Sequence, residues 1–508
     1  MMRPHSNTMS HPSTLGELKK SGYRPRSVKE ELRANLITRI RTKQPLFEGI
    51  HGYEHTVVPA LERAILAGHS INLLGLRGQA KTRMARSLVQ LLDEWMPVVA
   101  GSEVNDDPLA PISRYAKDQL DIHGDNTPIA WVHRNDRYTE KLATPDVTVA
   151  DLIGDSDPIK AANLKLDYSD ERVIHFGLVP RSHRGIFVIN ELPDLQPRIQ
   201  VALFNILQEG DVQIRGFKLR LPLDIQFVFT ANPEDYTNRG AIITPLKDRI
   251  QSQILTHYPP TIELGMRITA QELRSPQDQV RRVRVPDLIR VLVERIALEA
   301  RESDYVDRKS GVSARLTISA LESAISAAEL RALRTGEERT TVRIADLFAV
   351  GPAINGKIEL VYEGEQEGAE KVARHLLSQA LRNVFLELFP DPEKARRRAK
   401  ADGKGRTAPD PYAGVVAHFD DHAVELPQDA PDAVYTRMVQ EVPGLEDLVR
   451  SRHAYLDAAE LPVWMEFVLH GLAELSRVGR ADLDGVTRFS DLMGSVFSGE
   501  EDGEAGDR

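Results

Sequence analysis

Short apolar runs alternate with amphipathic or polar stretches over the first half of the chain. Four runs have the length of buried strands: 70–75 (SINLLG), 129–132 (IAWV), 185–190 (GIFVIN) and 225–232 (IQFVFTAN). Short continuous apolar runs are typical of strands that are buried on both faces. Because helical or polar segments separate them, the pattern predicts an α/β domain in which helices flank a parallel sheet.

Helical periodicity appears at two places before the first strand. Ser27 and Glu30 have the spacing of a capping box, and leucines follow at helical intervals. A second amphipathic segment, 55–68, ends at Gly68, which can close a helix. Both segments predict helices that lead into the sheet.

After Pro286 the strand-like runs stop. We expect helices there, in the segments 286–301, 317–334, 343–350 and from 369 onward. Residues 390–413 are charged and rich in proline and glycine, which predicts a flexible linker. The pattern therefore predicts a small all-α lid followed by a helical C-terminal extension.

These patterns divide the chain into seven expected parts. They are a disordered N-terminal segment 1–26, an α/β domain 27–260, an α-helical lid 261–355, a helical connector 356–389, a linker 390–413, a helical domain 414–497 and an acidic disordered tail 498–508. Two stretches interrupt the α/β alternation. Residues 160–184 break the helix expected between the second and third strands, and 210–224 alternate around Gly216 as a hairpin would.

Composition excludes several kinds of chemistry. The chain has no cysteine, so disulfides, thiolate catalysis and cysteine zinc sites are excluded, and a cytoplasmic location is expected. No stretch approaches the ~20 apolar residues of a membrane span, and residues 1–20 lack the apolar core of a secretory signal. A net charge of -10 argues against nucleic-acid binding by the whole surface.

The strongest chemical signal is the segment Gly75-Leu-Arg-Gly78-Gln79-Ala80-Lys81-Thr82, which lies between an apolar run and a helical stretch. In this context the backbone N–H groups of a loop and a helix start can cradle phosphate oxygens. Lys81 would reach the β- and γ-phosphates of ATP, and the Thr82 hydroxyl would bind Mg²⁺. Ala80 stands where glycine is usual, and we expect it to adopt a helix-start conformation. The alternative is a lysine at the start of an ordinary helix.

A second signal is the pair Asn190-Glu191 at the end of the run 185–190. Ligands bind at the carboxyl edge of parallel strands. P-loop ATPases carry Asp and then Glu here, the first for Mg²⁺ and the second for the attacking water. Asn190 keeps an acceptor oxygen but loses the charge, whereas Glu191 keeps the catalytic position. The alternative is a strand end with a helix-capping asparagine.

Three further residues complete the candidate site. Asn232 ends the last apolar run, where it would orient water, although Asn-Pro also forms plain turns. Arg249 follows a helical segment and could act as an arginine finger on a neighbouring subunit, with Arg239 as the alternative. Arg315 begins a lid helix and would contact phosphate, unless it is a solvated surface residue. No group of His, Asp or Glu has the spacing of a metal site.

In this order, the motifs GLRGQAKT, GIFVINE, LFNILQEGDVQIRG, FTANPED, LKDRI and SARLTISALE resemble AAA+ ATPases of the clade with a helix-two insert. They are most similar to the group of the magnesium-chelatase I subunit and the MoxR-type ATPases, whose loop pattern G-x-x-G-x-A-K-T contains the alanine found at Ala80. The resemblance covers about residues 40–350, and Asn190 departs from it. The C-terminal residues 360–508 resemble no family.

The resemblance implies a P-loop AAA+ core that binds ATP and Mg²⁺ and assembles into a hexameric ring with ATP between subunits. It places Gly52 and Tyr53 near adenine and Arg315 on the sensor-two helix. It also implies a partner, a von Willebrand A-domain protein with a metal-dependent adhesion site. The alternatives are a motor subunit of a true magnesium chelatase, an activator of the alternative sigma factor, whose signature loop GAFTGA is absent, and a low-turnover nucleotide-gated scaffold.

Overall fold

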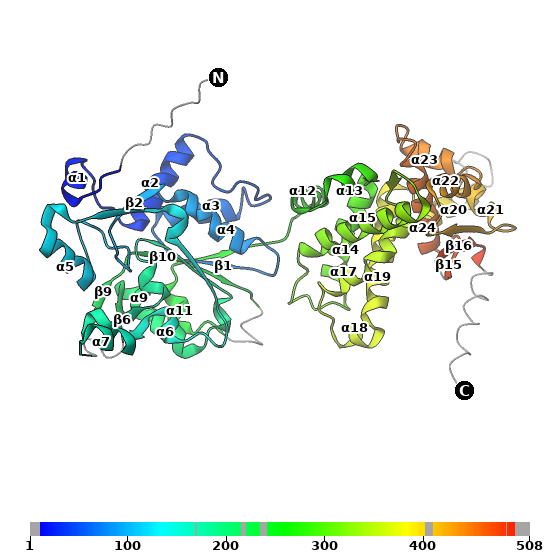
Figure 1. The fold of residues 1–508 in the computed structure, drawn as a ribbon. Coiled ribbons are helices and arrows are strands. Elements are labelled where there is room, and N and C mark those ends of the chain that lie inside the picture. The colour runs from blue at the N-terminus through cyan, green and yellow to red at the C-terminus, as the bar shows by residue number, and fades with distance from the viewer. Residues whose placement is uncertain are drawn as a thin grey trace, which may run out of the picture. The chain divides into compact units, whose positions relative to one another are not determined.

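The chain divides into two compact units, residues 1–257 and 258–508. The computed structural model describes residues 11–167, 170–214, 220–233, 241–401, 410–483 and 485–492. Figure 1 shows a sheet with helices in the first unit, and a mainly helical second unit. No helix in the described ranges has both the length and the apolarity needed to cross a membrane.

The first unit is built on a five-stranded parallel sheet with the order β11-β1-β10-β7-β4. Its strands are β1 (Ile71–Leu74), β4 (Tyr138–Leu142), β7 (Gly185–Asn190), β10 (Ile225–Ala231) and β11 (Ser252–Leu255). Every residue of β1, β7 and β10 is buried. These three central strands confirm the predictions at 70–75, 185–190 and 225–232.

Two helical layers cover the two faces of this sheet. Ile186 and Val188 pack with the helices α2 (Val28–Arg41), α3 (Val57–Leu66) and α4 (Lys81–Ser87). Phe187 and Ile189 pack with α6 (Val149–Leu152), α8 (Leu178–Arg181), α9 (Pro197–Glu209) and α11 (Thr244–Arg249). Because side chains alternate along a strand, β7 supplies both cores. The other α-helices in the described part of the first unit are α1 (Leu15–Lys20), α5 (Arg114–His123) and α7 (Pro158–Leu164).

The prediction of a core strand at 129–132 is wrong. Residues 129–133 form β3 (Ile129–His133), which pairs antiparallel with β2 (Trp95–Val99) outside the main sheet. The edge strand of the main sheet is β4, whose sequence YTEKL is too polar to show as an apolar run. The predicted hairpin in 210–224 is confirmed by the antiparallel pair β8 (Asp211–Gln213) and β9 (Arg220–Pro222), whereas Gly216 lies outside the described residues.

The expectation of disorder up to residue 26 is also wrong for the described part of that segment. Helix α1 buries Leu15 and Leu18, and the amide of Leu15 donates a 3.0 Å hydrogen bond to the carbonyl of Thr127. Two buried leucines in one short helix make too brief an apolar pattern to be recognised in the sequence. The interrupted stretch at 160–184 contains most of α7, all of α8 and the strand β6 (Ile174–Phe176), which pairs with β5 (Gly154–Ser156).

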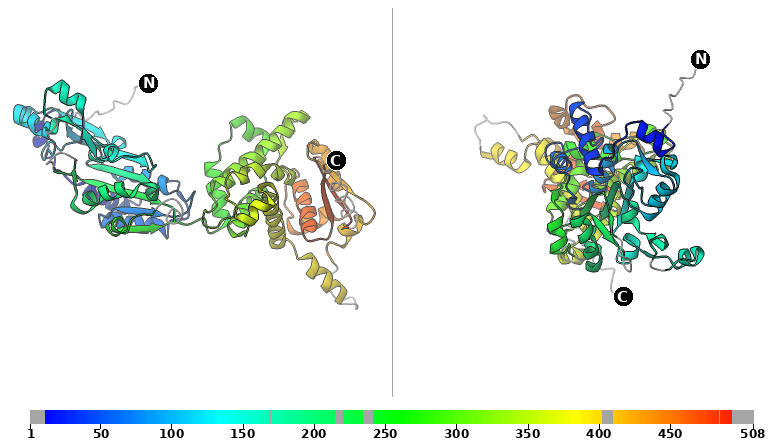
Figure 2. Two further views of the ribbon diagram at one scale, coloured as in Figure 1. Left: turned by 90° about the horizontal axis from the view of Figure 1, so that it is seen from below. Right: turned by 90° about the vertical axis from the view of Figure 1, so that its left-hand side faces the viewer.

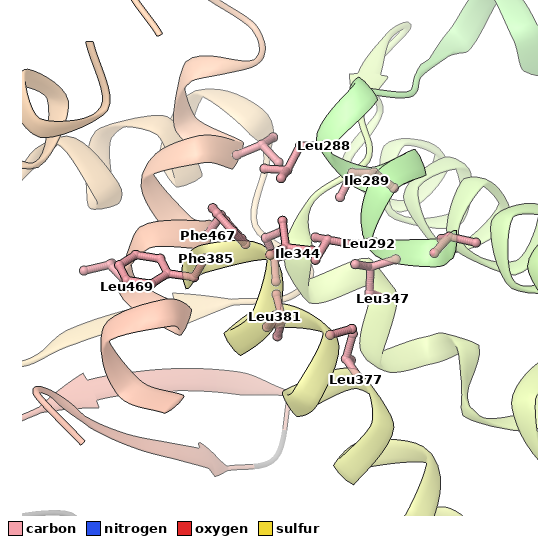
Figure 3. Close-up of a cluster of buried hydrophobic side chains, with 14 of the residues drawn as sticks. Leu288, Ile289, Leu292, Ile344, Leu347, Leu377, Leu381, Phe385, Phe467 and Leu469 are labelled. Atoms are coloured by element: carbon pink, nitrogen blue, oxygen red, sulfur yellow. The ribbon is translucent and has the colours of Figure 1, made fainter. Parts of the chain in front are cut away.

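The second unit has one hydrophobic core that extends from the lid helices to the C-terminal strands. In Figure 3, Leu292 and Ile344 of the lid lie beside Leu381 and Phe467 from later helices. The helices are α12 (Ile262–Glu272), α13 (Gln277–Arg282), α14 (Asp287–Glu302), α15 (Arg315–Thr335), α16 (Ile344–Leu347), α17 (Gly351–Asn355), α18 (Tyr362–Glu367), α19 (Ala369–Leu388), α20 (Pro392–Ala401), α21 (Ala413–His418), α22 (Asp432–Gln440), α23 (Leu445–Arg452) and α24 (Leu461–Glu474).

Two predictions for this unit need correction. The predicted helical domain 414–497 contains a three-stranded antiparallel sheet of β14 (Val424–Pro427), β16 (Val486–Ser490) and β15 (Gly479–Leu483). The expected linker 390–413 contains α20, which extends away from the rest of the second unit in both views of Figure 2. Tyr412, near the end of that segment, is fully buried because its ring joins the common core.

Buried polar groups also join the lid to the C-terminal helices. The carboxylate of Glu466, on α24, accepts hydrogen bonds from the amides of Ile344 at 3.0 Å and Ala345 at 3.2 Å. These are amides of the first turn of α16, which have no partner within their own helix. The lid and the extension are therefore parts of one folded unit.

Candidate functional site

The loop 75–80 connects β1 to α4 at the carboxyl edge of the sheet. The Lys81 ammonium is buried and donates hydrogen bonds to the carbonyls of Gly75 and, at 3.0 Å, Leu76. A Cβ at position 75 would lie 1.9 Å from Thr256 Oγ1, so the start of the loop requires glycine. The strand-loop-helix arrangement predicted for the phosphate loop is confirmed, with Lys81 turned toward its own loop.

Ala80 does not have the helix-start conformation expected from the sequence. Its φ of 56° and ψ of 18° are left-handed, and Gly78 in the same loop has a φ of 74°. A left-handed backbone brings the Cβ of alanine close to the next carbonyl, at a cost of about 1–2 kcal/mol. The loop therefore retains the backbone shape usual for glycine at position 80 while carrying a strained alanine.

Tyr53 supports the phosphate loop from outside. Its hydroxyl lies 3.0 Å from the carbonyl oxygen of Gln79 and 2.8 Å from that of His257, and its side chain is buried. The preceding Gly52 has a φ of 86°, which favours glycine. Tyr53 thus contacts the backbone of a loop residue predicted to bind nucleotide, while the placement of Gly52 and Tyr53 near adenine stays a prediction.

The two residues expected near Mg²⁺ lie close together. Thr82, on α4, points its hydroxyl at the side-chain oxygen of Asn190, at the end of β7, over 3.4 Å. Hydroxyl and amide oxygens are hard ligands of the kind that suits Mg²⁺. Within the described ranges, no three His, Asp or Glu side chains gather as a metal site. The donor set therefore fits a cation that takes most of its remaining ligands from phosphate and water.

Glu191 follows Asn190 in a left-handed conformation, with a φ of 54° and a ψ of 51°. Its amide donates a 3.2 Å hydrogen bond to the hydroxyl of Thr230 on the adjacent strand β10. Asn232, which is buried, follows the end of β10, and the amide of Gly75 donates a 3.1 Å hydrogen bond to the carbonyl of Ala231. The strand ends that carry Glu191 and Asn232 therefore lie beside the phosphate loop.

The sequence interpretation missed Glu140, on β4. Its carboxylate accepts hydrogen bonds from Asn190 at 2.6 Å, from Tyr138 at 2.9 Å and from Arg86 at 2.8 and 3.0 Å. Burial alone would raise the pKa of Glu140, but the hydrogen bonds from Arg86, Tyr138 and Asn190 outweigh it and lower that pKa below its usual value. Glu140 is therefore ionised at neutral pH, one hydrogen bond away from Asn190.

Arg249 lies at the end of α11 and contacts α9 of its own chain. The guanidinium donates hydrogen bonds of 2.9 and 2.6 Å to the side chain of Gln208 and one of 2.7 Å to the carbonyl of Pro245. It also lies 5.2 Å from the ring centroid of Phe204. Its role as an arginine finger stays a prediction, and Arg239 lies outside the described residues.

Arg315 begins α15 in the second unit, and its side chain is exposed. Its amide donates a 3.1 Å hydrogen bond to the hydroxyl of Ser313. A phosphate contact by the Arg315 guanidinium stays a prediction.

No protein-family model matches the chain. Among solved structures, it is similar to a Cytophaga hutchinsonii protein provisionally described as an ATPase (17% identity, TM-score 0.29, 71% of this chain and 97% of that chain). It is also similar to NtrX from Brucella abortus (15% identity, TM-score 0.37, 73% of this chain and 70% of that chain). A third similar structure is the complex of subunits BchI and BchD of magnesium chelatase (21% identity, TM-score 0.32, 63% of this chain and 98% of that chain).

Those TM-scores are low, and the fold class follows instead from the parallel sheet, its flanking helices and the loop between β1 and α4. The predicted α/β core, a parallel sheet flanked by helices with a phosphate loop between β1 and α4, is confirmed at the level of fold.

Proposed function

We propose that this protein is a Mg²⁺-dependent ATPase of the AAA+ type that uses ATP to remodel a partner protein. The observation that carries the proposal is the meeting of Lys81, Thr82 and Asn190 at one edge of the sheet, with Thr82 and Asn190 3.4 Å apart. Side chains at the carboxyl edge of parallel strands occupy the usual ligand position of α/β folds.

Each residue has a distinct part in this proposal. Lys81 exchanges the carbonyls of Gly75 and Leu76 for phosphate oxygens when ATP enters, so that a phosphate anion replaces neutral acceptors. Glu191 accepts a proton from the attacking water, and Asn232 orients that water. Bound Mg²⁺ would neutralise charge on the β- and γ-phosphates.

Assembly into a hexameric ring would complete the site. In such a ring, Arg249 would leave Gln208 and reach the γ-phosphate bound by the next subunit, an effect worth about 10³–10⁵ in rate. The family resemblance further supports a von Willebrand A-domain protein as the partner. A motor subunit of magnesium chelatase is the alternative with the same chemistry, and neighbouring genes for porphyrin synthesis would favour it.

A second candidate, a nucleotide-gated scaffold with little turnover, is favoured by one observation. Asn190, at the end of β7, lacks the carboxylate expected at that position. In this case ATP would change the assembly of the chain without being consumed at a useful rate.

Steady-state phosphate release from ATP tests the proposal against the scaffold. The motor predicts Mg²⁺-dependent turnover by the wild-type protein, whereas turnover at background, with assembly still responding to ATP, would favour the scaffold. For the partner, ATP-loaded Glu191→Gln serves as bait and Lys81→Ala as the matched control. A von Willebrand A-domain protein that copurifies with the first and not the second would support the remodelling role.

A further inference from the structure

The carboxylate that is absent from the end of β7 is present on the adjacent strand. Glu140 pairs with Val188 in the parallel register of β4 and β7, two residues before Asn190. Residues two apart leave a strand on the same face, so Glu140 and Asn190 project to the same side of the sheet. This is the side of α4, since Val188 packs in the same core as Met84. The Glu140 carboxylate thus accepts a hydrogen bond from the Asn190 side chain, whose oxygen faces Thr82.

A directional chain of hydrogen bonds determines which end of the Asn190 amide faces the phosphate loop. The backbone amide of Glu191 can only donate, so Thr230 Oγ1 accepts from it at 3.2 Å. The hydroxyl proton of Thr230 then goes to Asn190 Oδ1 at 3.1 Å. Asn190 Nδ2 consequently faces Glu140 at 2.6 Å, where a carboxylate can only accept. The amide oxygen is left facing the hydroxyl of Thr82.

Glu140 is itself held in place from the helix that carries Thr82. Arg86 lies one turn after Thr82 on α4 and makes a two-point contact with the carboxylate, at 2.8 and 3.0 Å. Tyr138 adds a third donor at 2.9 Å. The side chain of Glu140 is 21% exposed and that of Arg86 is 64% exposed, so the carboxylate lies deeper than its cationic partner.

We propose that Glu140 is a positioning residue that supplies, through Asn190, the negative charge usually provided by an aspartate at the end of β7. It orients the Asn190 oxygen toward the Mg²⁺ side of Thr82, and its charge polarises that oxygen. This inference rests on the proposed function, because it requires a magnesium nucleotide at the phosphate loop. The negative charge nearest to the Mg²⁺ site then comes from Glu140 on β4, and not from a residue of β7.

Aspartate at position 190 should not improve the Mg²⁺ site while Glu140 is present. Replacing Asn190 by aspartate restores the residue usual in the family but places two carboxylates against each other in the contact that is now 2.6 Å. Like charges at that distance repel, so Asn190→Asp alone would disturb the site. In the double variant Asn190→Asp/Glu140→Gln, the carboxylate and the amide exchange strands, and the hydrogen bond between them is retained.

The test measures how binding of a fluorescent, non-hydrolysable ATP analogue depends on Mg²⁺ concentration. The variants are Glu140→Gln, Asn190→Asp, the double variant and Arg86→Gln, each checked by thermal unfolding without nucleotide. Removing an outer-shell partner typically costs 10–100-fold in metal affinity, so Glu140→Gln should raise the half-saturating Mg²⁺ concentration at least about tenfold. Asn190→Asp should also raise it, and the double variant should return to within about threefold of wild type.

Arg86→Gln distinguishes the loss of the Glu140 charge from the loss of the ion pair between Arg86 and Glu140. It breaks the same ion pair but keeps the carboxylate, which the hydrogen bonds from Tyr138 and Asn190 still position, so it should lower the Mg²⁺ requirement or leave it unchanged. If Arg86→Gln raised the requirement as much as Glu140→Gln, or if the double variant were no better than the single ones, the inference would be overturned. A wild-type protein that bound the analogue with no response to Glu140→Gln would overturn the inference alone. One that bound no analogue would overturn the proposed function as well.

Discussion

Asn190 donates a 2.6 Å hydrogen bond to Glu140, an ionised carboxylate on the neighbouring strand. In the sequence, Asn190 stands alone as a loss of charge from the candidate Mg²⁺ site. In the structure, the same asparagine connects Thr82 with a carboxylate 50 positions earlier in the chain. The neutral residue is therefore compatible with a working site, and this favours the motor over the scaffold.

Glu191→Gln should retain ATP and lose turnover. The proposed role of Glu191 is proton acceptance in the transition state, and removing a general base costs about 10²–10⁴ in rate while ground-state binding persists. Phosphate release and ATP binding should be measured on the same preparation. Glu209→Gln, which removes an exposed carboxylate at the end of α9, is the matched control and should behave as wild type. Equal turnover in both variants would exclude Glu191 as the base.

Ala80→Gly should stabilise the first unit. Ala80 has a φ of 56°, and glycine removes the left-handed strain at a gain of about 1 kcal/mol. As a matched control, Ala85→Gly lies inside α4 and should destabilise by about 1 kcal/mol or more, because a helix interior disfavours glycine. Chemical unfolding followed by fluorescence measures both changes. A loss of stability in Ala80→Gly would show that this loop conformation is not strained.

Lowering the pH should destabilise the first unit through His183. Burial lowers the pKa of His183 from 6.5 to about 4, and its Nδ1 accepts a 2.9 Å hydrogen bond from the amide of Asp224. Below the unfolded pKa, the unfolded chain binds the proton and the folded chain does not, so stability falls as the pH drops. From pH 7 to pH 5 the loss should be about 2 kcal/mol.

His183→Asn keeps an acceptor for that amide and should flatten this part of the pH profile. Asp224 has the opposite effect on stability. Burial raises its pKa, so its protonation at lower pH stabilises the folded state. An unchanged slope in unfolding free energy between the two proteins would refute the role of His183.

Arg249 should act in trans. Mixing Lys81→Ala with Arg249→Ala should restore ATP hydrolysis, because some interfaces then combine an intact pocket with an intact arginine. Mixing Lys81→Ala with Glu191→Gln is the control and should restore nothing, since those two residues belong to the same pocket. With mixed rings verified, an absence of recovery in the first mixture would favour Arg239 or an enzyme that works without a ring.

The sequence was sufficient for the centre of the fold and insufficient for its edges. Strands β1, β7 and β10 are buried on both faces, so most of their residues are apolar and the sequence shows them as short apolar runs. Strand β4 lies at the edge, and its half-buried polar residues do not form an apolar run. The run at 129–132 is more apolar, although it pairs with β2 outside the main sheet. The polarity of β4 also concealed Glu140, because its importance depends on strand pairing with β7.

The sequence also did not predict the backbone conformation of Ala80 or the C-terminal sheet. The amino-acid sequence of the phosphate loop does not distinguish a left-handed Ala80 from one in a helix-start conformation. The φ angle of Ala80 depends on how the loop closes between Gly75 and Lys81. The C-terminal sheet leaves no clear pattern in the sequence, because β15 and β16 are short and mix exposed with buried positions. The pairing of β14 with β16 joins segments about 60 residues apart, which local patterns do not contain.

Calorimetric titration with Mg-ATP tests the central claim, that the loop ending at Lys81 binds the nucleotide. The wild-type protein should bind about one ATP per chain, as expected of a single phosphate loop. Lys81→Ala removes charge-assisted contacts worth about 3 kcal/mol and should weaken binding about 100-fold or more. Lys117→Ala, which removes an exposed lysine from α5, should bind as wild type does. Wild-type affinity in Lys81→Ala, or no binding by the wild-type protein, would contradict the account.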